Sequence, residues 1–465
     1  LLMPATTTPA PGGLLRFATA GSVDDGKSTL IGRLLYDSKS LLADHVSAVE
    51  AASRKRGMAD IDLSLLTDGL LAEREQGITI DVAYRYFATA VRTFIVSDSP
   101  GHLQYTRNMV TAASTADVAV LLVDATKGLL AQTRRHAYLS RWVGIRRIVL
   151  AVNKMDLVGW AQARFDTIRA EFDAFAATLG FERIEAIPLS ALSGDMVVAR
   201  GDAMPWYTGP TLLEFLETVP ARDGAHAGAA RFPVQRVVRL PATVTDALSA
   251  WRAAPGSAHT PDAPGRTVTG PAAPGADAAP ATFGSRGYQG TIAAGRIAIG
   301  DPIVVLPAGV EARVARILRL DAPVAEAHAD QAVTLVLDRE LDVSRGDLFA
   351  AADAAPTPVR EVTAEVCWFD PEALDPTRAY LLKHGAATVR AHLSAPDHRV
   401  DVDTLARVAA PGLSMNDIGR LRVSVQQPLA FEPYDAQRAT GAFILIDPFS
   451  HRTVAAGTVV ADRPA

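Results

Sequence analysis

The sequence has little of three features on which many proteins depend. It holds a single cysteine, Cys367, in 465 residues, so it can form neither an internal disulfide nor a thiolate zinc cluster, and this is typical of a reducing compartment. We interpret Cys367 as a small side chain within a β-strand. It also lacks a basic excess, with a net charge of −5, which disfavours binding of nucleic acid through its phosphates.

Long apolar runs are missing as well. Nowhere do about 18 uninterrupted apolar residues occur, so the sequence predicts no membrane-spanning helix. Residues 1–13 are rich in proline and threonine and lack the basic start and apolar run of a signal peptide, and we expect a flexible tail there. We therefore expect a cytoplasmic protein. Its 49% hydrophobic and 21% charged residues are ordinary for globular domains, and the length predicts about three of them.

Residues 14–228 alternate short apolar runs with longer amphipathic stretches. This pattern predicts an α/β domain with a mostly parallel sheet and helices on both faces. Residues 27–35 are expected to form the first helix, with an apolar stripe on one face. Strands are expected at 15–20, 80–87, 93–97, 118–123, 148–152 and 184–189. The alternation in 80–87 favours a place near the sheet edge.

The rest of the chain predicts two β-barrel domains, at 229–355 and 356–465. Short β-rich segments separated by glycines are typical of such barrels. Within the first barrel, residues 241–284 are rich in alanine, proline and glycine and hold few large apolar side chains. We interpret them as a flexible insertion, with docking of a partner as the alternative.

A phosphate-binding loop is predicted between the first strand and the first helix. Residues 21–28 fit the pattern G-x-x-x-x-G-K-[ST]. Its glycines let backbone N–H groups face the phosphates, while Lys27 reaches the β- and γ-phosphates and Ser28 ligates magnesium. The predicted nucleotide-binding residues here are Gly21, Ser22, Val23, Asp24, Asp25, Gly26, Lys27 and Ser28.

A second group of predicted site residues follows the third strand. Asp98 is placed to hold magnesium, and the backbone of Gly101 to approach the γ-phosphate. Thr79, which precedes the second strand, is a predicted magnesium ligand that lets its segment respond to loss of that phosphate. The loop consists of Asp98, Ser99, Pro100, Gly101 and His102.

Two further loops predict selectivity for guanine. Asp156 can accept hydrogen bonds from the guanine N1–H and exocyclic amine, and adenine would leave this carboxylate unpaired. Ser190 and Ala191 would brace the loop and offer a backbone donor to O6. The candidate residues are Asn153, Lys154, Met155, Asp156, Ser190, Ala191 and Leu192. All the motifs follow strands of one sheet, where ligands of open α/β sheets bind, so we predict a guanine-nucleotide site.

These motifs together resemble the translation-factor superfamily of GTPases. The resemblance implies that His102 orients the attacking water, with Val23 and Ile78 as the hydrophobic gate around it. It makes His102, Lys27 and Thr79 the predicted catalytic residues, with GTP and Mg²⁺ as cofactors. Ser99 departs from the threonine usual in the superfamily, and we expect little effect.

A closer resemblance is to the GTPase subunit of bacterial sulfate adenylyltransferase. It rests on GSVDDGKSTLIGRLLYDS, LLTDGLLAEREQGITIDVAYRYF, HLQYTRNMVTAAST and MPWYTGPTLLE, and later on RGYQGTIAAGRIAIGD and GAFILIDPFSHRTVAAG. The resemblance implies that GTP hydrolysis drives formation of adenosine 5′-phosphosulfate and pyrophosphate from ATP and sulfate on a small partner subunit. It implies neither a nucleic-acid nor a membrane partner. Some relatives carry a fused adenylylsulfate kinase, and we expect no kinase activity because no second phosphate-binding loop is visible.

Two rival interpretations stay open. A ribosome-dependent translation factor would share the switch and the barrels, although QYTRNM and MPWYTGPTLLE disfavour it. A nucleotide-binding scaffold that no longer hydrolyses GTP is disfavoured by the presence of Lys27, Thr79 and His102.

Overall fold

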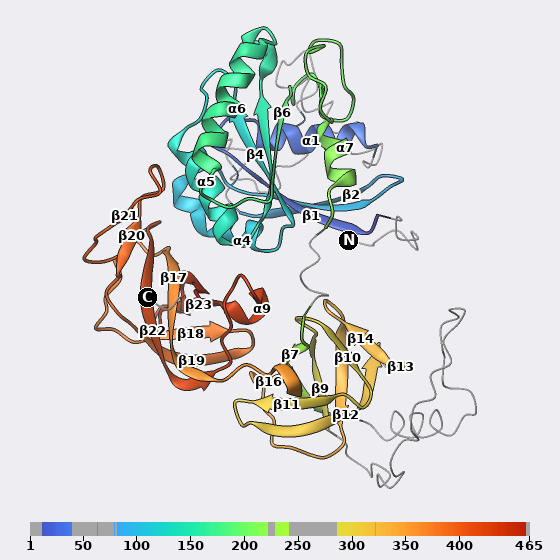
Figure 1. The fold of residues 1–465 in the computed structure, drawn as a ribbon, viewed down its shortest axis with the longest axis vertical. Helices are drawn as coiled ribbons and strands as arrows, with labels where there is room; N and C mark the ends of the chain where they lie inside the picture. The colour runs from blue at the N-terminus through green and yellow to red at the C-terminus, as the bar shows by residue number, and fades with distance from the viewer. Residues whose placement is uncertain are drawn as a thin grey trace. The chain divides into compact units, whose positions relative to one another are not determined.

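The computed structural model describes residues 12–39, 63, 79, 81–221, 228–240, 286–320 and 322–461. Three large sheets and a small two-stranded one organise these residues, and the large sheets are described in the order in which the chain reaches them (Figure 1). The first lies in an α/β domain and the other two are built from antiparallel strands, so the predicted architecture of an α/β domain followed by β-barrels is confirmed. The exact domain boundaries stay predictions.

The first sheet has six strands in the order β2-β3-β1-β4-β5-β6, and all but β2 run parallel. β4 is buried at every position, which is why its sequence is continuously apolar up to its last residue. The strands are β1 (Leu14–Ala20), β2 (Ala83–Ala88), β3 (Thr93–Asp98), β4 (Val118–Asp124), β5 (Arg147–Asn153) and β6 (Arg183–Pro188). All six predicted strands are therefore present.

Helices cover both faces of this sheet (Figure 1). α1 begins at Lys27, within the predicted phosphate-binding motif, and buries the apolar stripe expected of it. α7 begins with a capping box in which Thr211 and Glu214 satisfy each other's backbone N–H groups. The helices are α1 (Lys27–Asp37), α4 (Thr106–Ser114), α5 (Ala131–Trp142), α6 (Gln162–Ala176) and α7 (Leu212–Thr218).

The edge strand β2 confirms the place predicted for it. Among the strands that the structure describes, it pairs with β3 alone, and the two run antiparallel. The sequence did not reveal which of its faces packs on the domain: Phe87 is buried, while Tyr84 and Tyr86 are 40% and 63% exposed. The part of the prediction that covers residue 80 lies outside the described residues.

The second sheet forms the first β-rich domain around an apolar core that includes Phe232, Tyr288 and Phe349. Its strand order is β7-β16-β11-β12-β15-β9-β8, and β13 pairs with β12. The strands are β7 (Arg231–Pro233), β8 (Arg236–Arg239), β9 (Arg286–Thr291), β11 (Pro302–Leu306), β12 (Val310–Arg319), β13 (Ala322–Val324), β15 (Ala332–Leu337) and β16 (Leu348–Ala351). A separate two-stranded ladder joins β10 (Arg296–Ala298) to β14 (Glu326–His328).

The predicted insertion at 241–284 joins two paired strands of this sheet. β8 and β9 are antiparallel neighbours, with Arg239 opposite Arg286, so the chain leaves and returns at one place on the sheet. The predicted flexibility of the insertion, like that of the tail, concerns residues outside the described ranges, apart from residues 12 and 13.

The third sheet is a closed ring, because β17 pairs with both β24 and β22. Its order is β17-β24-β23-β18-β19-β22-β20-β21, where β20 and β21 extend beyond the ring. Cys367 is buried in β17, as its sequence context predicted. The elements are β17 (Val359–Trp368), β18 (Tyr380–His384), β19 (Ala387–Leu393), β20 (His398–Val400), β21 (Arg407–Val408), β22 (Ile418–Leu429), α9 (Arg438–Gly441), β23 (Ala442–Ile446) and β24 (Thr453–Val459).

No helix in the described ranges is long and apolar enough to cross a membrane.

Candidate guanine nucleotide site

The loop between β1 and α1 has the backbone that a phosphate cradle needs. Gly26 has a φ of 93°, a left-handed conformation that favours glycine, and a side chain there would meet the Asn153 amide at 2.5 Å. Asp24 is also left-handed, with a φ of 67°. The Ser22 N–H donates to Asp25 Oδ2 at 2.6 Å, and this bond curls the loop on itself. The residue types at 21–28 therefore allow and stabilise a tightly wrapped backbone.

Lys27 is buried beneath this loop. Its Nζ donates to the carbonyl oxygens of Gly21 at 3.1 Å and Ser22 at 2.8 Å. Burial lowers the pKa of Lys27, while the charges of Asp98 and Asp25 act in the opposite direction. Lys27 is thus held at the base of the loop, where a phosphate would replace the two carbonyls as its partner.

Oxygen atoms gather beside Lys27 at the end of β3. Ser28 Oγ lies 3.5 Å from Asp98 Oδ2, and Thr19 Oγ1 donates to Asp98 Oδ1 at 3.2 Å. Ser99 donates its hydroxyl to the Thr19 carbonyl, so the serine found in place of threonine still ties β3 to β1. A hydroxyl and a carboxylate are ligands that Mg²⁺ prefers, and the donor set fits this metal.

The loop after Asp98 runs directly over Lys27. A side chain at Gly101 would lie 2.6 Å from Lys27 Nζ and 2.8 Å from the Gly21 carbonyl, so glycine is required by this close approach. His102 is exposed, and its Nδ1 accepts from the Gln104 N–H at 3.3 Å. Gly101 and His102 therefore lie beside the place where a terminal phosphate would contact Lys27.

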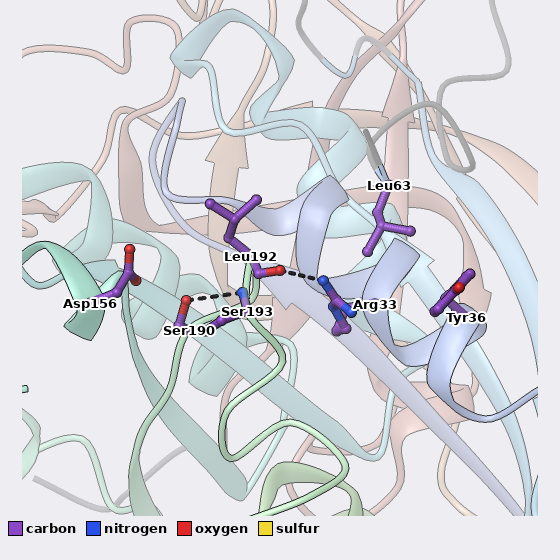
Figure 2. A pocket seen from close by; sticks show the side chains of 7 residues that line it. All are labelled: Arg33, Tyr36, Leu63, Asp156, Ser190, Leu192 and Ser193. Carbon is purple, nitrogen blue, oxygen red and sulfur yellow. Dashed lines mark hydrogen bonds between the residues drawn. The ribbon is translucent and has the colours of Figure 1, made fainter. Parts of the chain in front are cut away.

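A pocket of about 420 Å³ lies between α1 and the loops that follow β5 and β6 (Figure 2). Asp156, Ser190 and Leu192 are among its lining residues, together with Arg33. Asp156 Oδ1 is buried and has no hydrogen-bond partner in the described part of the chain. An unpaired buried carboxylate oxygen is costly, and a guanine edge would supply its missing donors.

Asn153 ties the phosphate loop to the loop after β6. Its Nδ2 donates to the Asp25 carbonyl at 2.7 Å, and its Oδ1 accepts from the Ala191 N–H at 2.9 Å. The Ala191 N–H, which we expected to face guanine O6, is thus bonded to Asn153 in this structure. Met155 is buried behind the loop.

Three side chains that support the site were not singled out from the sequence. Arg33 donates to the Ala191 carbonyl oxygen at 3.3 Å. It also donates to the Leu192 carbonyl oxygen (Figure 2). Asp124, at the end of β4, accepts from Lys154 Nζ at 2.8 Å. His136 in α5 accepts from the Gly21 N–H. Asp124 had a detectable signal, since it ends a buried apolar strand at the edge where ligands bind.

The predicted roles of the site residues, including Thr79 and Ile78, stay predictions. Thr79 is half-buried, and Ile78 lies outside the described residues. The structure brings the other predicted residues together in four neighbouring loops at the carboxyl ends of β1, β3, β5 and β6.

Replacing Asp124 by asparagine is expected to weaken binding of GDP and of GTP alike by about tenfold, because a charged hydrogen bond that fixes Lys154 is lost. Burial raises the pKa of Asp124, but hydrogen bonds from Lys154 and Thr126 outweigh it and leave this pKa below its usual range, so the native partner is a carboxylate. Titration with a fluorescent GDP measures the effect. Asp173→Asn makes the same change on the exposed surface of α6 and should bind normally; equal affinities for both variants would contradict the role of Asp124.

Comparison with known proteins defines the class. Residues 13–221 match the family described as the Elongation factor Tu GTP binding domain, and residues 361–460 match the GTP-eEF1A C-terminal domain-like family. The described geometry of the phosphate loop agrees with the first match. The N-terminal domain is thus a GTP-binding domain of the translation-factor type.

Relatives that match nearly the whole chain identify the family within this class. It is 49% identical to the Bifunctional enzyme CysN/CysC of Mycobacterium tuberculosis over 97% of this chain and 68% of that protein. It is 50% identical to the enzyme of the same name from Xylella fastidiosa, over 96% of this chain and 65% of that protein. It is 46% identical to the Sulfate adenylyltransferase subunit 1 of Rhizobium tropici, over 97% of this chain and 83% of that protein. The chain belongs to this family of sulfate adenylyltransferase GTPase subunits, and it spans about two thirds of its bifunctional members.

Proposed function

We propose that this chain is the GTP-hydrolysing subunit of a sulfate adenylyltransferase, and that its hydrolysis of GTP drives the synthesis of adenosine 5′-phosphosulfate and pyrophosphate from ATP and sulfate on a partner subunit. The observation that carries the GTPase part is the close approach of Gly101 to Lys27. It puts the loop that ends in His102 against the loop that would hold the terminal phosphate. The sulfate part rests on family membership.

Each residue has a role that its surroundings support. Lys27 exchanges its two carbonyl partners for phosphate oxygens, and the wrapped backbone of 21–26 supplies N–H donors. Gly101 contributes a backbone N–H at the γ-phosphate. His102 orients the attacking water from the exposed side of the site. Asp156 selects guanine through its unpaired buried oxygen.

Magnesium, held by Ser28, Asp98 and Thr79, would neutralise charge on the phosphates. The donor set fits because the Ser28 hydroxyl and the Asp98 carboxylate already lie 3.5 Å apart. Asp98 in turn is oriented by Thr19 from the neighbouring strand. The Ser28 and Asp98 oxygens are thus already close together, and binding of the metal would not have to move them into place.

Coupling to a partner needs two conformations with different affinities. Loss of the γ-phosphate removes the contact to Gly101 and so changes the balance between the conformations of its loop. The relative from Rhizobium tropici is named subunit 1, which implies an enzyme with more than one subunit. We propose a small nucleotidyltransferase as the partner. Neither a nucleic acid nor a membrane is part of this proposal.

The test measures GTP turnover by the chain alone and with the small subunit, each with and without ATP and sulfate. We expect turnover to rise when all components are present, and adenosine 5′-phosphosulfate to accumulate with GTP but not with GDP. Lys27→Ala is the control, because it removes the phosphate contact. Turnover that ribosomes stimulate, and that ATP and sulfate leave unchanged, would favour a translation factor and contradict the proposal.

A further inference from the structure

Helix α5 contributes two polar side chains that contact the backbone of the nucleotide-site loops. Gln132 and His136 lie one helical turn apart and therefore on the same face. His136 is buried, and its Nδ1 accepts from the Gly21 N–H at 3.0 Å. This bond satisfies the backbone at the point where the chain leaves β1 for the phosphate loop.

Gln132 extends the same connection to the other side of the site. Its Nε2 donates to the Gly101 carbonyl at 3.3 Å and lies 2.8 Å from His136 Nε2. That carbonyl belongs to the peptide that joins Gly101 to His102. The two side chains thus link the first residue of the phosphate loop to the peptide that carries the water-orienting histidine.

Three hydrogen bonds, from Gly21 to His136, from Gln132 to Gly101 and between Gln132 and His136, cannot all form at once. Burial, with the positive charge of Lys27 adding to it, lowers the pKa of His136 to about 3, so the ring is neutral and holds one proton. Because Nδ1 accepts from Gly21, that proton lies on Nε2. The Nε2–H then faces the Gln132 amide nitrogen, and two donors oppose each other at 2.8 Å.

Rotating the Gln132 amide removes this conflict and creates another. With its oxygen toward the ring, the amide accepts from His136 Nε2–H, but it no longer donates to Gly101. With its nitrogen toward Gly101, it holds that carbonyl and opposes the ring. The amide therefore has two competing partners, and each orientation satisfies one of them.

We propose that Gln132 is a positioning residue for GTP hydrolysis: its amide alternates between the Gly101 carbonyl and His136, and its bond to Gly101 sets the peptide that orients His102. This inference rests on the proposed GTPase function. His136 has a separate part, because its bond to Gly21 supports the phosphate loop in either orientation of Gln132. Loss of Gln132 therefore acts on the hydrolytic step, and loss of His136 acts on nucleotide binding.

The test uses Gln132→Met, which keeps the length of the side chain and removes both bonds. In the full chain with its partner subunit, we expect the single-turnover rate at saturating GTP to fall about tenfold, while the dissociation constants of GDP and of a non-hydrolysable GTP analogue change less than about threefold. Gln162→Met makes the same change at an exposed position of α6 and should match the wild type. Normal GDP binding shows that the variant is folded.

His136→Phe separates the two roles, because it keeps a ring and removes the acceptor for Gly21. We expect it to weaken binding of GDP and of the GTP analogue together by about tenfold. A Gln132→Met protein with a wild-type rate, or one that loses nucleotide affinity while its saturated rate is unchanged, overturns the inference. If the wild-type protein itself fails to hydrolyse GTP with its partner present, the proposed function is wrong and the inference falls with it.

Discussion

His102→Ala is expected to bind GTP normally and to hydrolyse it at least about 100-fold more slowly, because positioning of the attacking water is lost while the phosphate contacts remain. Those contacts come from the loop 21–28 and from Lys27, none of which His102 supports: its ring is exposed and bonds to the Gln104 N–H. Single-turnover hydrolysis with the partner subunit measures the rate. Titration with a non-hydrolysable analogue measures the affinity.

His392→Ala provides the matched control for this variant. His392 is exposed in β19, far along the chain from the nucleotide loops, and its removal should change neither quantity. A His102→Ala protein that turns over GTP at the rate of this control would contradict the water-orienting role. A parallel loss of GTP affinity would instead assign His102 to binding.

Asp156→Asn is expected to weaken GTP binding by at least about 100-fold, because an amide donor replaces a carboxylate acceptor opposite the guanine N1–H and amine. Xanthosine triphosphate has a carbonyl where guanine has its amine, so the variant should bind it better than GTP. The buried, unpaired Asp156 Oδ1 is the reason to expect a large effect. Competition between the two nucleotides measures the preference directly.

A reversed preference between GTP and xanthosine triphosphate distinguishes loss of base recognition from general damage to the loop. Asp166→Asn makes the same change at an exposed position of α6 and should keep the guanine preference of the wild type. If Asp156→Asn loses both nucleotides equally, the carboxylate supports the loop without reading the base, and our assignment of selectivity is wrong.

Much of the fold was readable from local patterns because those patterns report burial. β4 is apolar along its length and is buried at every position, and α1 carries its apolar residues on one face. The edge position of β2 followed from its alternation, yet alternation describes two faces without saying which one is covered. In the structure Phe87 lies on the covered face, and Tyr84 and Tyr86 are exposed.

In the candidate site, too, some residues could be predicted from the sequence and others could be found only in the structure. Glycines at 26 and 101 were predicted to allow close approach, and the structure places a side-chain amide and a lysine ammonium where their side chains would be. Arg33, Asp124 and His136 were missed because each acts through a residue distant in sequence. Nothing in the amino acids around His136 indicates that its ring faces Gly21, 115 positions earlier.

The sequence by itself therefore predicted the chemistry that we propose for this protein: a phosphate loop, an oxygen-rich metal position and a guanine-reading carboxylate, all encoded in short motifs whose spacing acts locally. Only the tertiary structure decided how these loops are held together. Asn153 joins Asp25 to Ala191 in this way, and α5 joins Gly21 to Gly101. The physical reason is that buried polar groups must find partners, and which partners lie within reach depends on the packing of distant segments.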